Sequence, residues 1–381
     1  MRILHVISSS GMYGAEAVIL NLCRSLNESG HDCQIAVFAH EPEPNLELWK
    51  KAQAHQVESH IIPCKGRVDR QVTGRIRDLA RNVKADIVHA HGYKADVYTY
   101  FALRKRRVPL LSTCHTWYDN DPLVTFYGVL DRHVLRRFDS VIAVSREVSE
   151  RVLKAGVPAE KVHLIRNGID VRPFVAAAAS RRDAPEIPGP MTVGIVGRLA
   201  PEKGIDVFIR AALLVLQWAP GTRFVIVGDG PEGCNLRELA NQLHVEDSIS
   251  FLGLRNDMPE VYLSFDLFVS SSRQEGLPMA ILEAMASGLP VIATKVGEVS
   301  TVITQGATGL LVDPENSEQL ARSIVALLGD SLLRSQLGSS AIETVARDFS
   351  AQRMANDYVC LYESTLNSAE RRDAESAPTV V

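Results

Sequence analysis

The sequence has no C-x-x-C pair, no long apolar run and no marked excess of one charge. Its six cysteines are scattered, which argues against both a zinc site and a disulfide framework and fits a reducing cytoplasm. The formal net charge of −4 gives no reason to expect a nucleic acid as partner. No apolar stretch reaches the length that spans a bilayer, so we expect a cytoplasmic protein that touches a membrane peripherally at most.

Three further sequence features are missing. The first ten residues, M-R-I-L-H-V-I-S-S-S, contain only a short apolar run and predict a strand rather than a signal peptide. No tandem repeat of short period is visible. Neither half of the chain starts with a complete G-x-G-x-x-G followed by an acidic ribose partner, which argues against a dinucleotide oxidoreductase.

What the chain does contain is a regular alternation of apolar strands and amphipathic helices. This pattern predicts α/β structure with parallel sheets covered on both faces. At 381 residues, two doubly wound Rossmann-like domains are the default expectation. The predicted strands are Ile3–Ile7, Gln34–Ala39, Ser59–Ile62, Ile87–Ala90, Leu110–Cys114, Ser140–Val144 and His163–Ile165, then Thr192–Val196, Arg223–Val227, Ser248–Leu252, Leu267–Ser270, Val291–Ala293 and Gly309–Val312.

Composition places the predicted domain boundaries. The first domain covers residues 1–170, and an alanine- and proline-rich stretch, 171–191, is expected to be a linker. The second domain covers 192–350. A helix follows at 351–367, and the polar residues 368–381 are expected to form a disordered tail.

Residues 270–290 form the stretch around which we consider the chain to be organised. They read S-S-S-R-Q-E-G-L-P-M-A-I-L-E-A-M-A-S-G-L-P, a loop followed by a short helix with Pro278 at its first position. Such a helix N-terminus attracts phosphate. Glu275 lies before the helix and Glu283 inside it, where its carboxylate could accept two hydrogen bonds from a ribose. The spacing alone also fits two solvated glutamates.

This E-x7-E string resembles that of the retaining GT-B glycosyltransferases of family 4. The resemblance implies the GT-B fold, in which two Rossmann-like domains face each other across a cleft and the last helix crosses back to the first domain. It further implies that Glu275 meets hydroxyls of the donor sugar and that Glu283 meets the ribose of the nucleotide.

The loop after the first strand of the second domain carries Arg198 and Lys203, in G-R-L-A-P-E-K-G. Two fixed cations at this edge could stabilise the diphosphate whose charge grows in the transition state, and could replace a metal. Taken alone, both could equally be surface cations. The string is the second one by which the chain resembles family 4, so the resemblance implies a catalytic role for both.

The same resemblance implies further donor-binding positions, several of them glycines that let a backbone approach a ligand. For Gly228 and Gly230, which lie in the string V-G-D-G-P, a plain tight turn is an equally good interpretation. The predicted donor-binding residues besides Glu283 are Gly14, Gly197, Gly228, Gly230, Arg255, Gly276 and Leu277. Where family members have a G-G-x-E type of string, this chain has Tyr13 at the first glycine of the pair.

His115 ends a predicted strand of the first domain. A lone histidine is more often structural, but its match to the family's cleft histidine implies a catalytic contact with the donor sugar. His91, Tyr93 and Lys94 are the predicted acceptor-side residues. Asp119-Asn120-Asp121 has the D-x-D form of metal-dependent glycosyltransferases, but we interpret it as a polar loop.

The resemblance therefore implies a retaining glycosyltransferase that moves a sugar from a nucleotide donor, expected to be UDP-linked, to a saccharide or lipid-linked acceptor in a cell-surface polysaccharide or lipopolysaccharide pathway. No cofactor and no metal are expected. A sugar-nucleotide epimerase of the same architecture and a non-catalytic binding protein are the alternatives. The basic clusters at 104–107 and 132–137 leave open a peripheral contact with the inner membrane leaflet.

Overall fold

The computed structural model describes residues 1–9, 11–12, 14–42, 44–66, 68–105, 108–115, 130–131, 133–182 and 189–376. It divides into two compact units, which are treated separately below. Unit 1 contains Met1–Gly168 and the chain from Ala351 onward, and unit 2 contains Ile169–Ser350. Tyr13 and the stretch Asp119–Asp121 lie outside the described residues, as does part of each basic cluster.

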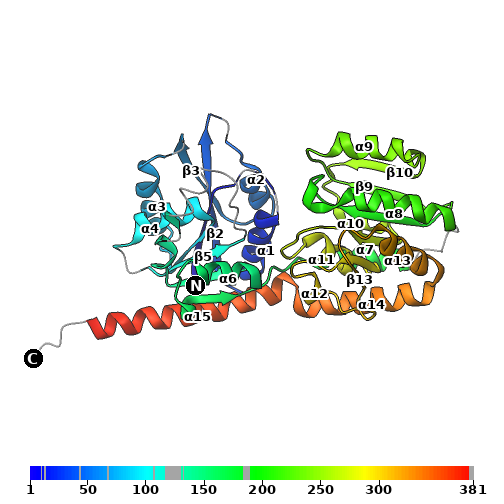
Figure 1. Ribbon diagram of the computed structural model, residues 1–381. Helices are drawn as coiled ribbons and strands as arrows, with labels where there is room; N and C mark the ends of the chain where they lie inside the picture. Colours follow the sequence, from blue (N-terminus) through cyan, green and yellow to red (C-terminus); the bar gives the residue numbers. More distant parts are fainter. Residues whose placement is uncertain are drawn as a thin grey trace, which may run out of the picture. The chain divides into compact units, whose positions relative to one another are not determined.

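Unit 1 is built on a seven-stranded parallel sheet with the order β3-β2-β1-β4-β5-β6-β7 (Figure 1). Its strands are β1 (Arg2–Ile7), β2 (Asp32–Glu41), β3 (Ser59–Lys65), β4 (Ile87–His91), β5 (Leu110–Cys114), β6 (Ser140–Ala143) and β7 (Val162–Leu164). Its helices are α1 (Gly14–Glu28), α2 (Glu47–Ala54), α3 (Gln71–Asn82), α4 (Tyr93–Leu103), α6 (Arg146–Lys154), the 3-10 turn η1 (Ala159–Lys161) and α15 (Ala351–Ser376).

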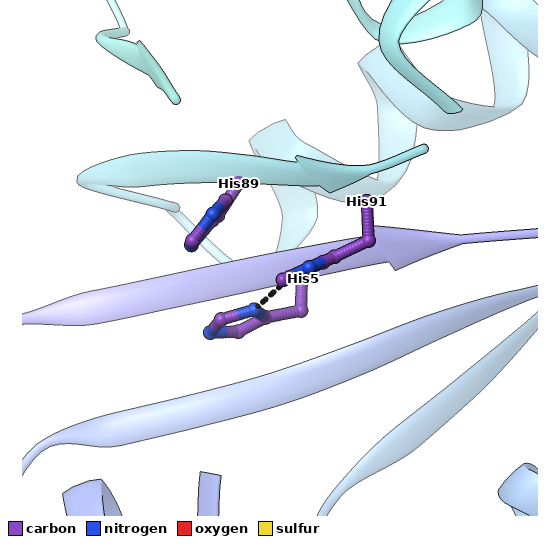
Figure 2. A group of neighbouring side chains, drawn as sticks. All are labelled: His5, His89 and His91. Atoms are coloured by element: carbon purple, nitrogen blue, oxygen red, sulfur yellow. Dashed lines mark hydrogen bonds between the residues drawn. The ribbon is translucent and has the colours of Figure 1, made fainter. Parts of the chain in front are cut away.

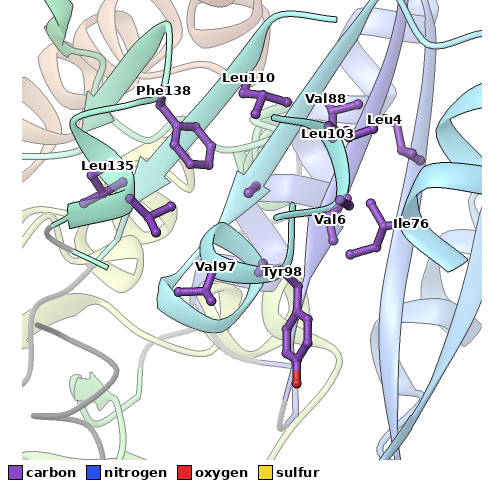
Figure 3. Packing of buried hydrophobic residues seen from close by; sticks show 14 of the residues in the cluster. Leu4, Val6, Ile76, Val88, Val97, Tyr98, Leu103, Leu110, Leu135 and Phe138 are labelled. Carbon is purple, nitrogen blue, oxygen red and sulfur yellow. The ribbon is translucent and has the colours of Figure 1, made fainter. Parts of the chain in front are cut away.

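The two faces of this sheet differ in chemistry. Leu4 and Val6 point to one face, where they join a fully apolar core with Ile76 of α3 and Val97 of α4 (Figure 3). Because side chains alternate along a strand, His5 between them points to the other face. There the sheet meets α15, which packs against α1.

Unit 2 is built on a six-stranded parallel sheet with the order β10-β9-β8-β11-β12-β13. Its strands are β8 (Thr192–Val196), β9 (Arg223–Val227), β10 (Ile249–Gly253), β11 (Leu267–Ser270), β12 (Val291–Thr294) and β13 (Leu310–Val312). Its helices are α7 (Arg172–Arg182), η2 (Pro201–Lys203), α8 (Ile205–Trp218), α9 (Gly233–Gln242), η3 (Glu246–Ser248), α10 (Met258–Leu263), α11 (Met279–Ala286), α12 (Val299–Val302), α13 (Ser317–Gly329) and α14 (Ser331–Asp348). An apolar core covers each face of the sheet.

Both sheets therefore contain the doubly wound arrangement that the sequence predicts, and every predicted strand has its counterpart. In such sheets the strand order reverses at one point, and ligands bind at the carboxyl ends of the strands there. The reversal lies between β1 and β4 in unit 1 and between β8 and β11 in unit 2.

Three local expectations differ from the structure. The stretch 171–191 contains helix α7, since its alanine-rich sequence has high helix propensity. Helix α15 continues to Ser376, well past the expected end at 367. Pro278 precedes α11 as its N-cap, with ψ of 115°, instead of occupying the first helical position. No helix within the described residues is both long and apolar enough to cross a bilayer.

Candidate functional site

The strand-order reversal of unit 2 brings Lys203 and Glu275 together, although 72 residues separate them in the sequence. Lys203 ends the loop after β8, and Glu275 lies on the loop after β11. The Lys203 Nζ and the Glu275 Oε1 are 2.5 Å apart, and the Ser272 hydroxyl donates to the same oxygen at 2.7 Å. The Glu275 side chain is only 9% exposed, so this ion pair is largely shielded from water. The Glu275 Oε2 accepts no hydrogen bond within the described part of the chain.

Arg273, which the sequence analysis did not single out, connects the loop after β11 to the segment that follows β8. Its guanidinium makes a bidentate contact with Asp206 in the first turn of α8, at 2.8 Å for each nitrogen. It also donates to the Pro201 carbonyl at 2.7 Å and pairs with Glu315. Although burial opposes it, the hydrogen bond from Arg273 lowers the pKa of Asp206. Arg273 thus fixes the loops that carry Lys203 and Glu275.

Close backbone packing explains several of the predicted glycines. A Cβ atom at Gly228, whose φ is +134°, would lie 1.9 Å from the Gly197 carbonyl oxygen. One at Gly230 would lie 2.5 Å from the Leu199 carbonyl oxygen. Hydrogen bonds tie the loops after β8 and β9 together, among them the one from the Gly197 N–H to the Val227 carbonyl at 2.9 Å. These glycines shape the loops at the reversal point, whether or not they also touch a ligand.

Glu283 lies on α11, five residues into the helix. Its Oε2 accepts a hydrogen bond from the Tyr262 hydroxyl at 2.9 Å, and its Oε1 accepts none from the described residues. Burial raises the pKa of Glu283 to about 7, and the hydrogen bond from Tyr262 acts in the opposite direction. One carboxylate oxygen is therefore held by the protein while the other is available to a ligand.

Among the described residues, no side-chain hydrogen bond joins Arg198 or Arg255 to Lys203 or Glu275. Arg198 is exposed and makes no side-chain hydrogen bond or ion pair with any described residue. Arg255 is paired with its neighbour Asp257 and, through that hydrogen bond, lowers the pKa of Asp257 to about 2. Leu277 is only 8% exposed and packs in an apolar core, whereas Gly276 is exposed.

Unit 1 gathers histidines on the α15 side of its sheet. His5 of β1 and His89 and His91 of β4 are all buried and lie side by side (Figure 2). The His5 Nδ1 and the His91 Nε2 are 2.7 Å apart, and the His91 Nδ1 is 3.1 Å from the Nε2 of His115, which follows β5. The sequence analysis named His91 and His115 but missed His5 and His89. The H-x-H pattern of β4 was the available signal, since alternate residues share a face.

Helix α15 covers this histidine cluster on one face of the sheet. The Tyr362 hydroxyl bonds the His89 Nδ1 at 2.8 Å, while the His89 Nε2 bonds the Thr113 hydroxyl, also at 2.8 Å. The Tyr358 hydroxyl lies 3.1 Å from that of Thr113. The helix from the end of the chain is thus bonded into the core of the first unit.

The other acceptor-side predictions lie at the start of α4. Tyr93 is 41% exposed, and the Lys94 Nζ is 3.4 Å from the His40 Nδ1. Burial lowers the pKa of Lys94. Gly14 begins α1 and is exposed.

Two groups of side chains in unit 1 have the composition of metal ligands: His5, His89 and His91, and His5, Cys23 and Cys33. In the first, hydrogen bonds occupy every ring nitrogen except the His5 Nε2. In the second, the two sulfurs are 2.8 Å apart, closer than the roughly 3.7 Å that two tetrahedral Zn–S bonds require. Neither group has the geometry of a metal centre. The cysteines, scattered in sequence, are free thiols, but two of them meet in the core.

Comparisons with known proteins match both halves of the chain. The family model of the glycosyl transferases group 1 matches residues 178–344, and that of glycosyltransferase family 4 matches residues 12–172. A GDP-mannose-dependent alpha-mannosyltransferase of Mycobacterium tuberculosis is 30% identical over 336 residues, which cover 83% of this chain and 84% of that protein. The N-acetyl-alpha-D-glucosaminyl L-malate synthase of Bacillus anthracis is 24% identical, with 94% and 95% covered.

Among solved structures, HepE of Anabaena in complex with UDP superposes with a TM-score of 0.80. It is 23% identical, and the match covers 96% of this chain and all of that one. The lipopolysaccharide outer core galactosyltransferase WaaB superposes with a TM-score of 0.72 at 17% identity, covering 96% of this chain and all of that one. These similarities show that the fold is GT-B.

Proposed function

Since this chain belongs to the group 1 glycosyl transferases of family 4, we propose that it transfers a sugar from a UDP-sugar to an acceptor hydroxyl, with retention of configuration and without a metal. The single observation that carries the proposal is the contact of Lys203 with Glu275 at the strand-order reversal of unit 2. That contact places a cation and a carboxylate where doubly wound sheets bind nucleotides.

Lys203 acts on the leaving diphosphate in this proposal. When a sugar–phosphate bond breaks, negative charge grows on the phosphate oxygens, and a fixed cation stabilises that charge. Glu275 pairs with the Lys203 ammonium group, and Arg273 bonds the Pro201 carbonyl of the loop that carries Lys203. Both contacts position the ammonium group before the substrate binds. Arg198, on the same loop and exposed, supplies a second cation. Two cations on the diphosphate perform the task for which other transferases use a divalent ion.

The two glutamates recognise hydroxyl groups. The Glu275 Oε2 is available to a hydroxyl of the transferred sugar, because Lys203 and Ser272 occupy only Oε1. The Glu283 Oε1 is available to the ribose, while Tyr262 holds Oε2. Ionised carboxylates form stronger hydrogen bonds than neutral groups do, so ribose binding favours the deprotonated form of Glu283.

In this proposal retention follows from a single displacement on one face of the sugar. The acceptor hydroxyl attacks from the face that the diphosphate leaves, and a phosphate oxygen takes its proton. The bond to the departing phosphate breaks as the new glycosidic bond forms, so no other base is needed. In the same proposal His115 hydrogen-bonds the sugar substrate, and Tyr93 and Lys94 belong to the acceptor side. The contacts of His91, whose two ring nitrogens bond to His5 and His115, give it a supporting place behind His115.

The choice of UDP rests on the structural relatives crystallised with UDP, whereas the mannosyltransferase relative is GDP-mannose-dependent. For the acceptor we propose a saccharide or lipid-linked saccharide of a cell-surface pathway. The similarity in fold to the lipopolysaccharide galactosyltransferase supports this class. Arg104 and Lys105 lie at the end of α4, where a cationic surface would assist contact with anionic lipid.

The test is a calorimetric titration of UDP, GDP and ADP, each with EDTA, into the wild type and into Lys203→Ala and Glu283→Ala. We expect UDP to bind without metal and each substitution to weaken binding by at least about 1 kcal/mol, the range for losing a charged hydrogen bond. An exposed-site control, Arg322→Ala on α13, should bind as the wild type does. A panel of UDP-sugars with and without acceptors then separates transfer from epimerisation. If the wild type binds none of the three nucleotides, the proposal is refuted.

A further inference from the structure

The rings of His5, His91 and His115 form one continuous hydrogen-bonded row. Each contact joins a δ nitrogen to an ε nitrogen, at 2.7 Å between His5 and His91 and at 3.1 Å between His91 and His115. The rings are nearly parallel, with interplanar angles of 18° and 28°. The first of these contacts is the dashed line of Figure 2.

Two members of the row, His91 and His115, are neutral imidazoles. Burial lowers the pKa of His115 to about 4 and that of His91 well below its usual range, so neither carries a charge at neutral pH. His5 is fully buried and lies beside His91 and the thiols of Cys23 and Cys33. A neutral imidazole has one N–H and one bare nitrogen.

Because His91 and His115 each have one N–H and one bare nitrogen, only two arrangements of the protons fit the contacts in the row. If the proton of His91 is on Nδ1, it is donated to His115, whose own proton must then be on Nδ1, and His5 must donate from Nδ1. If the proton of His91 is on Nε2, the same reasoning places the protons of both neighbours on Nε2. All three rings therefore share one tautomer, and a change at one end changes the other.

Each end of the row has a nitrogen without a partner. The His5 Nε2 and the His115 Nδ1 are both buried and form no hydrogen bond within the described residues. We propose that His5 and His91 are positioning residues that set the orientation and tautomer of His115, and thereby decide whether its buried Nδ1 carries an N–H or a lone pair. This inference rests on the proposed function for the role of His115.

His89 provides an internal contrast. Its ring stacks on that of His91 with 4.4 Å between centroids, but its two nitrogens bond to the hydroxyls of Tyr362 and Thr113. Hydroxyl groups rotate and can donate or accept, so they do not fix a tautomer. His89 is buried to the same extent yet stands outside the row.

The first experiment does not depend on activity. Long-range ¹H–¹⁵N correlation spectra of the full chain, labelled at histidine, report the tautomer of each ring, with assignments from single substitutions. The expected result is the same tautomer at His5, His91 and His115. Different tautomers within the row, or a charged ring at neutral pH, would overturn the proposal.

The second experiment uses amide side chains that mimic one ring nitrogen each. Asparagine places its amide where the δ nitrogen was, and glutamine reaches the position of the ε nitrogen. His91→Asn therefore keeps the contact with His115, while His91→Gln loses it. We expect His91→Gln to lower kcat by about 10²-fold, as a misplaced catalytic group does, with KM for the nucleotide sugar little changed. His91→Asn should retain most of the activity.

The controls separate positioning from folding. His89→Asn and His89→Gln each remove one bond of a buried imidazole and should have equal, small effects on kcat. UDP binding, which unit 2 supplies, should survive in every variant. Equal losses of kcat in His91→Asn and His91→Gln would refute the positioning role. A wild type without transferase activity would instead refute the proposed function, and the tautomer measurement would still decide whether the row is real.

Discussion

The two units use one topology to hold different kinds of chemistry. Both sheets reverse their strand order next to their first strand, between β1 and β4 in unit 1 and between β8 and β11 in unit 2. In unit 2 the polar groups near the reversal are the charged Lys203 and Glu275, which stand on loops. In unit 1 they are imidazoles, and His5 and His91 lie within the strands themselves.

The cost of burial explains this difference. A charge within a sheet would be separated from water, so charged groups remain on loops, paired and partly hydrated. A neutral imidazole can lie in the core provided that its nitrogens find partners. The comparison teaches that the same strand order can hold charged side chains on loops in one unit and neutral imidazoles within strands in the other.

The largest expected effect comes from removing the charge in unit 2. Lys203→Met should lower kcat/KM by about 10²–10³-fold, because it removes a stabilising cation and leaves the shielded Glu275 carboxylate unpaired. Steady-state kinetics with the best donor measure the loss. Arg322→Met, which removes an exposed cation on α13, is the control and should change nothing. If Lys203→Met were as active as the wild type, the charge of Lys203 would not contribute to catalysis by unit 2.

The next prediction tests how tightly the loops of unit 2 are packed. In Gly297→Ala the new Cβ atom would lie 1.7 Å from the Glu275 carbonyl oxygen, so the loop that carries Glu275 must move. Lys203, which binds the diphosphate in the proposal, would lose its paired carboxylate and its fixed position, so UDP affinity should fall by more than about tenfold, or about 1.4 kcal/mol. The measurement is calorimetric titration.

Gly306→Ala is the matched control for that loop. Gly306 also has a positive φ, +73°, but nothing lies within 4 Å of its Cβ position. The substitution should lower stability slightly and leave UDP affinity unchanged. Equal losses of affinity in both variants would show that backbone strain, and not displacement of Glu275, is the cause.

A smaller effect is expected from the polar core of unit 1. Tyr362→Phe removes the hydroxyl that bonds the His89 Nδ1 and should cost about 1–3 kcal/mol, the range for leaving a buried polar group unpaired. In scanning calorimetry the transition of unit 1 should move to lower temperature, while UDP affinity stays constant. Tyr100→Phe removes the hydroxyl of a partly buried tyrosine that makes no side-chain hydrogen bond with described residues, and should leave the transition in place.

The smallest expected effect concerns the pH dependence of unit 2. The pKa of Glu283 is raised from 4.5 to about 7 by burial, so the folded protein holds a proton that the unfolded chain has lost. The free energy of unfolding should therefore fall as the pH rises from 4.5 to about 7. UDP affinity should increase with pH through the same region, because the ribose hydroxyls donate to the carboxylate.

Glu283→Gln should flatten both pH profiles and stabilise the protein above pH 7, since its neutral amide carries no charge into the core. Denaturation and titration series across pH measure the two profiles. Glu318→Gln, at a highly exposed glutamate of α13, should keep both profiles as they are in the wild type. An unchanged profile in Glu283→Gln would assign the pH dependence to another group.

The sequence by itself determined the strands and the doubly wound pattern of both units. Apolar runs such as Ile3–Ile7 and Leu267–Ser270 specify strands because backbone pairing and side-chain alternation are local and periodic. Lys203 and Glu275 could be named because their strings resemble those of family 4, whereas each residue taken alone also fits a solvated surface position.

Only the tertiary structure decided which polar groups meet. Lys203 finds Glu275 across 72 residues, His5 finds His91 across 86, and His89 finds Tyr362 across 273. No local pattern encodes such pairs, because they depend on which strands become neighbours and which helix covers which face. A buried polar group must find its partner wherever the fold supplies one, and that requirement can be checked only after the chain has folded.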